Sequence, residues 1–321
     1  SELKDKLKKL RGGSMVSTLP RSTFNYNSFE CSFRRKRAAS GFESQPPLLL
    51  IHPVGIGLAS WFWDQFLDEW NGGEVYVPDL IGCGDSQEWD PSEQGLFVPL
   101  DWVRQLETLW VAEIRRPMVV MSQGGLAPLA IQLASRMTDN WDGQRAVCGL
   151  VLASPPEWSA ISTGIDEAEV RRNYNQLATF LGPSPLGTLA FNALCARFFV
   201  KFFSDLFLFA EGGADDKFLD ACCVEAVPEK RYPIIAFNAG LVLQRGLYAE
   251  LTALQQPALV LAGESGGKPK TDEYATFVPK ARVERIAGKN VLPWEEPKPT
   301  CEAVARFVAA CPSEEQRVNA L

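Results

Sequence analysis

The residue of this sequence best placed for nucleophilic chemistry is Ser122. It follows the β-branched residues Val119 and Val120, and two glycines and a helix-like pattern come after it. An apolar strand that stops at such a serine is typical of the sharp turn that exposes a nucleophilic hydroxyl. A serine hydroxyl is a weak nucleophile at neutral pH, so a base must accept its proton, and histidine suits that task. The chain contains only one histidine, His52.

Four short motifs follow four predicted elements of the chain. "HPVGIG" (52–57) comes after the first apolar run, "DLIGCGDS" (79–86) after the second and "MSQGG" (121–125) after the third, and "GKNVLPWEEP" (288–297) lies near the end. The carboxyl ends of parallel strands meet at one edge of a sheet, and sites form there. The order of the motifs therefore indicates one site built from distant segments.

The elements that must position these residues alternate between apolar runs and amphipathic stretches, which predicts βαβ units and a mostly parallel sheet. Strand signals fade from about residue 157 to 250, where aromatic, helix-like segments predict a helical cap inserted over the sheet. We expect an α/β core over 45–156 and 251–312, a basic flexible tail at 1–44 and a short tail at 313–321. Strands are expected at 46–54, 74–80, 117–122, 146–156, 257–265 and 281–288, and helices at 61–70, 99–114, 125–137 and 298–311.

Together the four motifs resemble those of the α/β-hydrolase superfamily, over roughly residues 46–310. "DLIGCGDS" matches the superfamily pattern D-L-x-G-x-G-x-S at every fixed position, and "HPVGIG" matches its His-Gly loop except at Pro53. "PDLIGCGDS" with "GKNVLPWEEP" is most similar to hydrolase-fold proteins of cyanobacteria and plastids. The resemblance implies a doubly wound α/β fold, but a fold alone does not fix a reaction.

The resemblance also assigns roles by position. Ser122 takes the nucleophile position, and the backbone N–H groups of Gln123 and Val54 take the oxyanion-hole positions. Val120 departs from the small residue that normally stands two positions before the serine. Pro53 has no N–H and cannot act as a donor.

The catalytic base of the superfamily is missing from its usual place. A histidine is expected near Lys289 and Asn290, but none lies there or anywhere after residue 52. Asparagine cannot accept the proton, and lysine can do so only when strongly desolvated. His52 is therefore weighed as an alternative base, although the superfamily histidine of this loop usually has a structural role.

The catalytic acid is also doubtful. The usual position follows the strand at 257–265, where the chain reads "GESGGKPK" (263–270) with Ser265 and Gly266 in place of aspartate. Glu264 is adjacent, and an acid after the preceding strand would be Glu157. A triad without its histidine loses about 10⁶ in turnover. The sequence thus predicts a hydrolase fold with a degenerate triad.

Three functions remain open at this stage. The first is binding of a small apolar or amphipathic ligand, or of a protein partner. The second is a serine-hydrolase-like or lyase-type enzyme acting on an ester or carbonyl, with His52, Lys289, Glu157 or a water moving the proton. The third is a scaffold subunit of a larger assembly. No metal-ligand spacing or P-loop is present, so no cofactor or metal is expected.

The aromatic stretch "FNALCARFFVKFFSDLFLFAEGG" (191–213) bears on the first function. Its apolar residues would cover nearly the whole circumference of one helix. That pattern fits a helix packed on all sides, the wall of an apolar pocket, or a surface for a membrane or a partner.

Charge and cysteine usage limit the compartment and the partners. The net charge is −7, which argues against nucleic-acid binding, and no apolar stretch is long enough for a membrane span. Residues 1–44 carry a net charge of +6 and are rich in Ser, Thr and Arg, as in an organelle leader or a solvated basic tail. "FRRKRAAS" (33–40) would suit an anionic membrane surface or an acidic partner. Eight cysteines without CxxC indicate reduced thiols. We expect a plastid location, or otherwise a cytoplasmic one.

Overall fold

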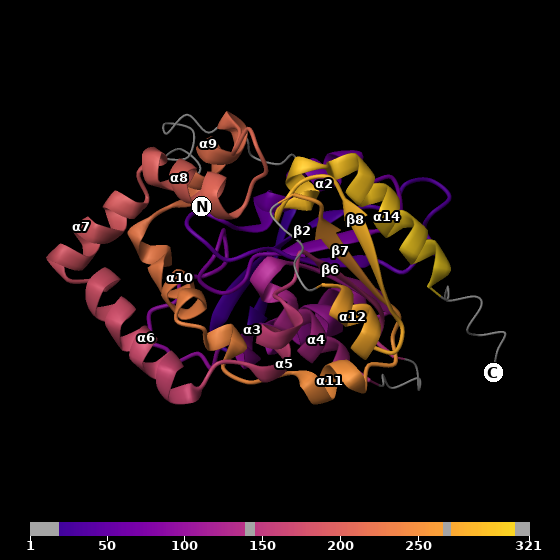
Figure 1. The fold of residues 1–321 in the computed structure, drawn as a ribbon, viewed down its shortest axis with the longest axis horizontal. Coiled ribbons are helices and arrows are strands. Elements are labelled where there is room, and N and C mark those ends of the chain that lie inside the picture. Colours follow the sequence, from indigo (N-terminus) through magenta and orange to yellow (C-terminus); the bar gives the residue numbers. More distant parts are fainter. Residues whose placement is uncertain (1–18, 139–144, 266–270, 312–321) are drawn as a thin grey trace.

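One twisted sheet forms the centre of the molecule (Figure 1). The computed structural model describes residues 19–138, 145–265 and 271–311, which contain eight strands in the order β1-β2-β4-β3-β5-β6-β7-β8. Neighbours from β4 to β8 pair in parallel, whereas β2 runs antiparallel to both β4 and β1. The strands are β1 Arg21–Tyr26, β2 Phe29–Lys36, β3 Leu48–Ile51, β4 Val75–Pro78, β5 Met118–Gln123, β6 Val147–Ala153, β7 Ala258–Gly263 and β8 Ala281–Ile286.

Helices cover both faces of the sheet, as expected for a doubly wound fold. The covering helices are α2 (Asp64–Glu69) and α14 (Pro297–Ala310) on one face, and α3 (Leu100–Leu109) and α4 (Ala127–Arg136) on the other (Figure 1). Successive side chains of a strand point to opposite faces, so both faces of each central strand must be apolar. In β3, Leu48 and Leu50 pack with α2 and α14, and Leu49 and Ile51 with α3 and α4.

Between β6 and β7, residues 154–257 form a helical insertion that contains no strand. In Figure 1 its helices from α6 to α10 lie on the side of the molecule away from α14. Its α-helices are α5 Trp158–Thr163, α6 Glu167–Leu181, α7 Pro185–Leu194, α8 Arg197–Phe207, α9 Asp216–Glu225, α10 Arg231–Asn238 and α11 Tyr248–Thr252. Two short helices, α12 (Asp272–Phe277) and α13 (Leu292–Glu295), lie in the chain beyond β7.

The aromatic stretch at 191–213 is not one helix. It is divided between α7 and α8, which meet at Cys195 and Ala196 with a bend of 59°. Among the helices described, none is by itself both long and apolar enough to cross a membrane, although the bent pair α7–α8 meets those two criteria jointly.

The expected basic tail at 1–44 is corrected by the structure for residues 19–44. Phe29, Cys31 and Phe33 alternate along β2 and are buried, as are Phe24 and Tyr26 of β1. This period of two predicts a strand with one buried face, but the density of positive charge obscured it. Residues 1–18 and the expected tail at 313–321 lie outside the described residues.

The basic residues of "FRRKRAAS" mostly serve the fold. Arg34 is buried and pairs with Asp64 of α2 at 2.6 Å. Arg35 donates to Glu74 at 2.6 Å, and the Lys36 ammonium donates to the carbonyl of Trp70 at 2.7 Å. These side chains fasten β2 to the segment between α2 and β4, so they are not a free patch for an anionic partner.

Candidate functional site

The expected nucleophile does not stand at the turn after β5. Ser122 lies within the strand, fully buried, opposite Ile51 of β3 and Leu152 of β6. Gln123 is still extended, with φ −105° and ψ 128°, because it continues the pairing with β6. The positive φ that marks the sharp turn occurs at Gly124, at 60°. The structure therefore places Ser122, the residue expected at the nucleophile position, within β5, and places Gly124, which has no side chain, on the turn.

The hydroxyl of Ser122 has no hydrogen-bond partner among the described residues. Along β5, Val119 and Met121 point toward α2 and α14, and Val120 points toward α3 and α4. By this alternation Ser122 points into the second of these layers, away from the sheet edge where a substrate would bind.

His52, the residue weighed as an alternative base, makes two hydrogen bonds inside the fold. Its Nε2 accepts a hydrogen bond from the backbone N–H of Leu80 at 3.0 Å, and its Nδ1 lies 2.8 Å from the carbonyl of Pro53 and donates to it. Both ring nitrogens are thus used by the neutral tautomer. Complete burial lowers the pKa of His52 below its usual value. The imidazole holds together the loops that follow β3 and β4, which is a structural role.

Lys289 and Asn290 connect the loop after β8 to the end of α8. The Lys289 ammonium donates to the carbonyl of Leu206 at 2.7 Å, and the Asn290 amide donates to that of Phe207 at 2.6 Å. The side-chain amide of Gln123 donates to the carbonyl of Asn290. No hydrogen bond joins Lys289 or Asn290 to the Ser122 hydroxyl among the described residues, and the region where the histidine was expected links β5 to the insertion instead.

The candidate acids are solvent-facing. Glu157 is exposed at the N-terminus of α5, and Glu264 and Ser265 are exposed after β7. Gly266 lies outside the described residues. In the described part of the chain, no hydrogen bond joins Glu157, Glu264 or Ser265 to the side chain of Ser122 or of His52.

The structure places the two expected oxyanion-hole residues, Val54 and Gln123, in different surroundings. Val54 is buried beside the pocket described below. Gln123 belongs to the strand, and the first amide after the turn residue is that of Gly125, which is the geometrical place for a donor of this kind. The assignment of Gln123 is therefore corrected, and its side chain acts as a connector instead.

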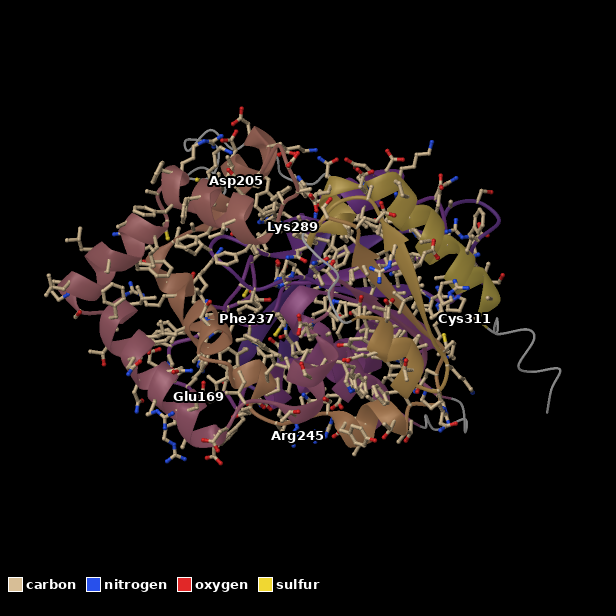
Figure 2. The ribbon with its side chains drawn as sticks, viewed as in Figure 1. Glu169, Asp205, Phe237, Arg245, Lys289 and Cys311 are labelled. Atoms are coloured by element: carbon tan, nitrogen blue, oxygen red, sulfur yellow. The ribbon has the colours of Figure 1, made fainter. Side chains whose placement is uncertain are left out.

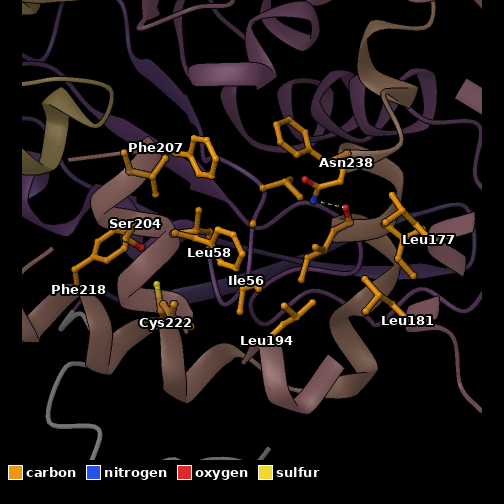
Figure 3. A pocket seen from close by; sticks show the side chains of 18 residues that line it. Ile56, Leu58, Leu177, Leu181, Leu194, Ser204, Phe207, Phe218, Cys222 and Asn238 are labelled. Carbon is orange, nitrogen blue, oxygen red and sulfur yellow. Dashed lines mark hydrogen bonds between the residues drawn. The ribbon is translucent and has the colours of Figure 1, made fainter. Parts of the chain in front are cut away.

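An apolar pocket of about 580 Å³ lies between the helical insertion and the loop that follows β3 (Figure 3). Val54, Ile56 and Leu58 of that loop form one side of it. The insertion contributes the other side from α6 to α10 (Leu177, Leu181, Leu194, Val200, Phe203, Ser204, Phe207, Phe218, Cys222, Ile234, Ile235, Phe237 and Asn238). The volume falls within the usual range for small-molecule sites.

Phe237 of α10 connects the pocket with the turn after β5. A Cβ atom added to Gly125 would come within 2.6 Å of the Phe237 ring, so the ring rests on the backbone of that residue. A Cβ atom added to Gly124 would meet nothing within 4 Å. The pocket thus lies beside the turn after β5, and Phe237, labelled in Figure 2, lies between the two. Sequence reasoning missed Phe237, although the apolar run "PIIAF" (233–237) was a signal for it.

The polar groups of the pocket are few and unsuited to proton transfer. Asn238 donates its amide to Ile234 at 2.8 Å, and Ser204 is almost fully buried. Burial raises the pKa of the Cys222 thiol well above its usual value, so the thiol stays protonated at neutral pH. No carboxylate, imidazole or ammonium is among the lining residues, and no cluster of metal-ligating side chains occurs in the described ranges. This surface can bind apolar molecules but holds no acid or base.

Comparison with known proteins gives the class of protein. Residues 48–303 match the alpha/beta hydrolase family, so the chain belongs to that family. No curated protein matches the sequence significantly.

Solved structures share the fold at low sequence identity. A haloalkane dehalogenase DbeA-M1 loop variant from Bradyrhizobium elkanii matches with a TM-score of 0.65 and 19% identity, over 91% of this chain and 96% of that one. A thermophilic esterase from Thermogutta terrifontis matches with a TM-score of 0.63 and 17% identity, over 91% of this chain and 98% of that one. A proline iminopeptidase from Mycobacterium smegmatis matches with a TM-score of 0.63 and 18% identity, over 90% of this chain and 98% of that one. These likenesses establish the fold and not the reaction.

Proposed function

We propose that this member of the alpha/beta hydrolase family binds a small apolar molecule and does not hydrolyse esters through a serine triad. The observation that carries the proposal is the apolar pocket, which Phe237 links to a turn whose central residue is Gly124. The turn supplies no nucleophile, and His52 is occupied by Leu80 and Pro53. A wall of Leu, Ile, Val and Phe side chains favours ligands that gain by leaving water, at about 25 cal/mol per Å² of apolar surface buried.

Binding of the neutral fluorophore N-phenyl-1-naphthylamine tests this proposal. The intact chain should enhance its fluorescence saturably. In Leu177→Trp/Leu194→Trp, two indoles occupy space inside the pocket, so the affinity should fall by about tenfold or more, equivalent to about 1.4 kcal/mol. Fluorescence titration measures the dissociation constant, and far-ultraviolet circular dichroism checks the fold of the variant.

The matched control is Leu186→Trp/Leu189→Trp. Both leucines are exposed on α7 and neither lines the pocket, so the affinity should stay within about twofold of the parent chain. Equal losses in both double variants, or no saturable signal in the parent chain, would contradict binding in this pocket.

The alternative enzyme would use the Ser122 hydroxyl, which is buried and which the sequence assigns to the nucleophile position. A fluorophosphonate probe labels activated serines. Because Ser122 is buried and has no base beside it among the described residues, we expect no labelling above that of Ser122→Ala. Gel fluorescence after incubation, with a competent serine hydrolase as the positive control, measures this. Strong labelling that disappears in Ser122→Ala would establish the enzyme instead.

A further inference from the structure

Large apolar side chains are exposed along α7 and α8, two helices of the insertion that lie on the other side of the molecule from the C-terminal helix α14 in Figure 1. Leu186 is 79% exposed and Phe198 is 74% exposed. We call this surface the outer face, and its other members are Leu189, Phe199, Phe202, Phe203, Leu206 and Phe207. Exposed aromatic residues in such number are unusual on a soluble surface and mark a binding region.

The helical period explains why these side chains face outward together. Phe198, Phe202 and Leu206 follow one another at intervals of four along α8 and form one stripe. Val200 and Ser204 are buried on the side of α8 that packs against the rest of the protein. The aromatic stripe therefore points away from the core, and its exposure is a consequence of the packing of α8.

The composition of α7 and α8 suits an interface between hydrocarbon and water. Residues 173–196, which include α7, contain no Asp, Glu, Lys or Arg, whereas α8 carries Arg197, Lys201 and Asp205. The pair α7–α8 meets the length and composition criteria of a membrane segment, but only as two helices bent by 59°. Because the inner sides of both helices pack on the protein through Phe191 and Val200, the pair can lie along a bilayer surface but cannot cross it.

The charges that border the outer face are already paired within the protein. Arg197 lies 2.6 Å from Asp216, and Lys201 lies 2.7 Å from Asp205. Anionic lipid would therefore gain little from these cations, and the net charge of −7 opposes approach to an anionic surface. These paired charges favour a zwitterionic bilayer over an anionic one. The apolar side chains of the outer face would enter the interface of such a bilayer.

The outer face is continuous with the pocket. Phe203 and Phe207 line the cavity and are also partly exposed on the outer face, and Figure 3 shows Phe207 at the cavity beside Leu58. We propose that the outer face docks on a zwitterionic lipid bilayer, from which the pocket takes its apolar ligand. The docking stands on the outer face itself, whereas the transfer of ligand rests on the proposed function.

Flotation of the full chain with phosphatidylcholine vesicles tests the docking. The parent chain should float with the vesicles equally well at low and high salt, because apolar insertion is not screened. Phe198→Ser/Phe202→Ser should lower the partition coefficient by about tenfold or more, since two large apolar side chains no longer enter the interface. Phe97→Ser is the matched control, because Phe97 is 78% exposed outside the outer face, and it should float like the parent chain.

Three results would overturn the docking: a parent chain that does not float, a Phe198→Ser/Phe202→Ser variant that floats unchanged, or a parent dimer in sedimentation that this variant abolishes. The last result would assign the outer face to a second copy. Neither Phe198 nor Phe202 lines the pocket, so the variant should still bind N-phenyl-1-naphthylamine. If the parent chain does not bind the dye, the proposed function is rejected. The flotation result alone then decides the docking.

Discussion

At the scale of single residues, the chemistry depends on which residue occupies the turn after β5. Ser122 and Gly124 are two positions apart, but the first is an extended, buried strand residue and the second has a φ of 60°. Only the residue on the turn projects toward a ligand above the sheet edge. A shift of two residues along the chain thus separates a hydroxyl inside the strand from the position on the turn.

His52 makes a prediction about pH at this scale. Burial lowers its pKa, the nearby Asp79 carboxylate opposes that effect, and Arg34 adds to it. In the unfolded chain the imidazole takes up a proton near pH 6.5, while in the folded chain it stays neutral to lower pH. The contribution of the neutral His52 imidazole to the free energy of unfolding is therefore fully present above about pH 6.5. It decreases as the pH falls, by at most about 1.4 kcal/mol per pH unit.

The measurement is the free energy of unfolding in urea at pH 7.5 and pH 5.5, for the parent chain and for His52→Gln. Other acids contribute equally to both proteins, so the parent chain should lose more stability between the two pH values than His52→Gln. An identical loss in both proteins would mean that His52 titrates normally in the folded state.

At the scale of elements, the hairpin β1–β2 shows how a basic segment becomes part of a core. The Arg34 and Asp64 side chains are only 3% and 11% exposed, so their charges pair in a region of low dielectric. The side chain of Tyr26 donates to Asp101 of α3 at 2.6 Å and attaches the outermost strand to a helix on the same face. Both contacts join residues far apart in the sequence.

The Arg34–Asp64 pair gives a prediction for this element. Arg34→Ala leaves the Asp64 carboxylate buried without its partner, which should lower the free energy of unfolding by about 3–5 kcal/mol. Arg37→Ala is the control, because Arg37 is exposed, and it should change stability by no more than about 0.5 kcal/mol. Thermal and urea unfolding measure both. Equal stability of the two variants would mean that the hairpin is not docked on α2.

At the scale of the whole molecule, the pocket exists only because the insertion and the core meet. Phe237 of α10 rests on Gly125, and the loop after β8 holds the end of α8 through Lys289 and Asn290. These contacts place apolar side chains over the sheet edge where the family builds its sites. The packing of α8 against the rest of the protein also turns its stripe of Phe198, Phe202 and Leu206 outward. The pocket and the outer face therefore both result from the way in which the insertion packs on the core.

The sequence by itself determined the fold class, the order of the six core strands and of the helices α2, α3, α4 and α14, and the absence of a histidine near Asn290. Such features are local, since apolar periodicity and turn residues act over a few neighbouring positions. The two strands of the N-terminal hairpin were also readable from alternation, but charge outweighed that signal.

Only the tertiary structure decided the end of β5, the partners of His52 and the pocket. Gln123 remains in the strand because it pairs with Ala153 of β6. The Nε2 atom of His52 accepts a hydrogen bond from the backbone N–H of Leu80, 28 residues away. Cavities arise where side chains from separate helices fail to fill a space, which no local pattern encodes. Contacts between distant segments, and not the residue types at the turn, therefore determine what this site can do.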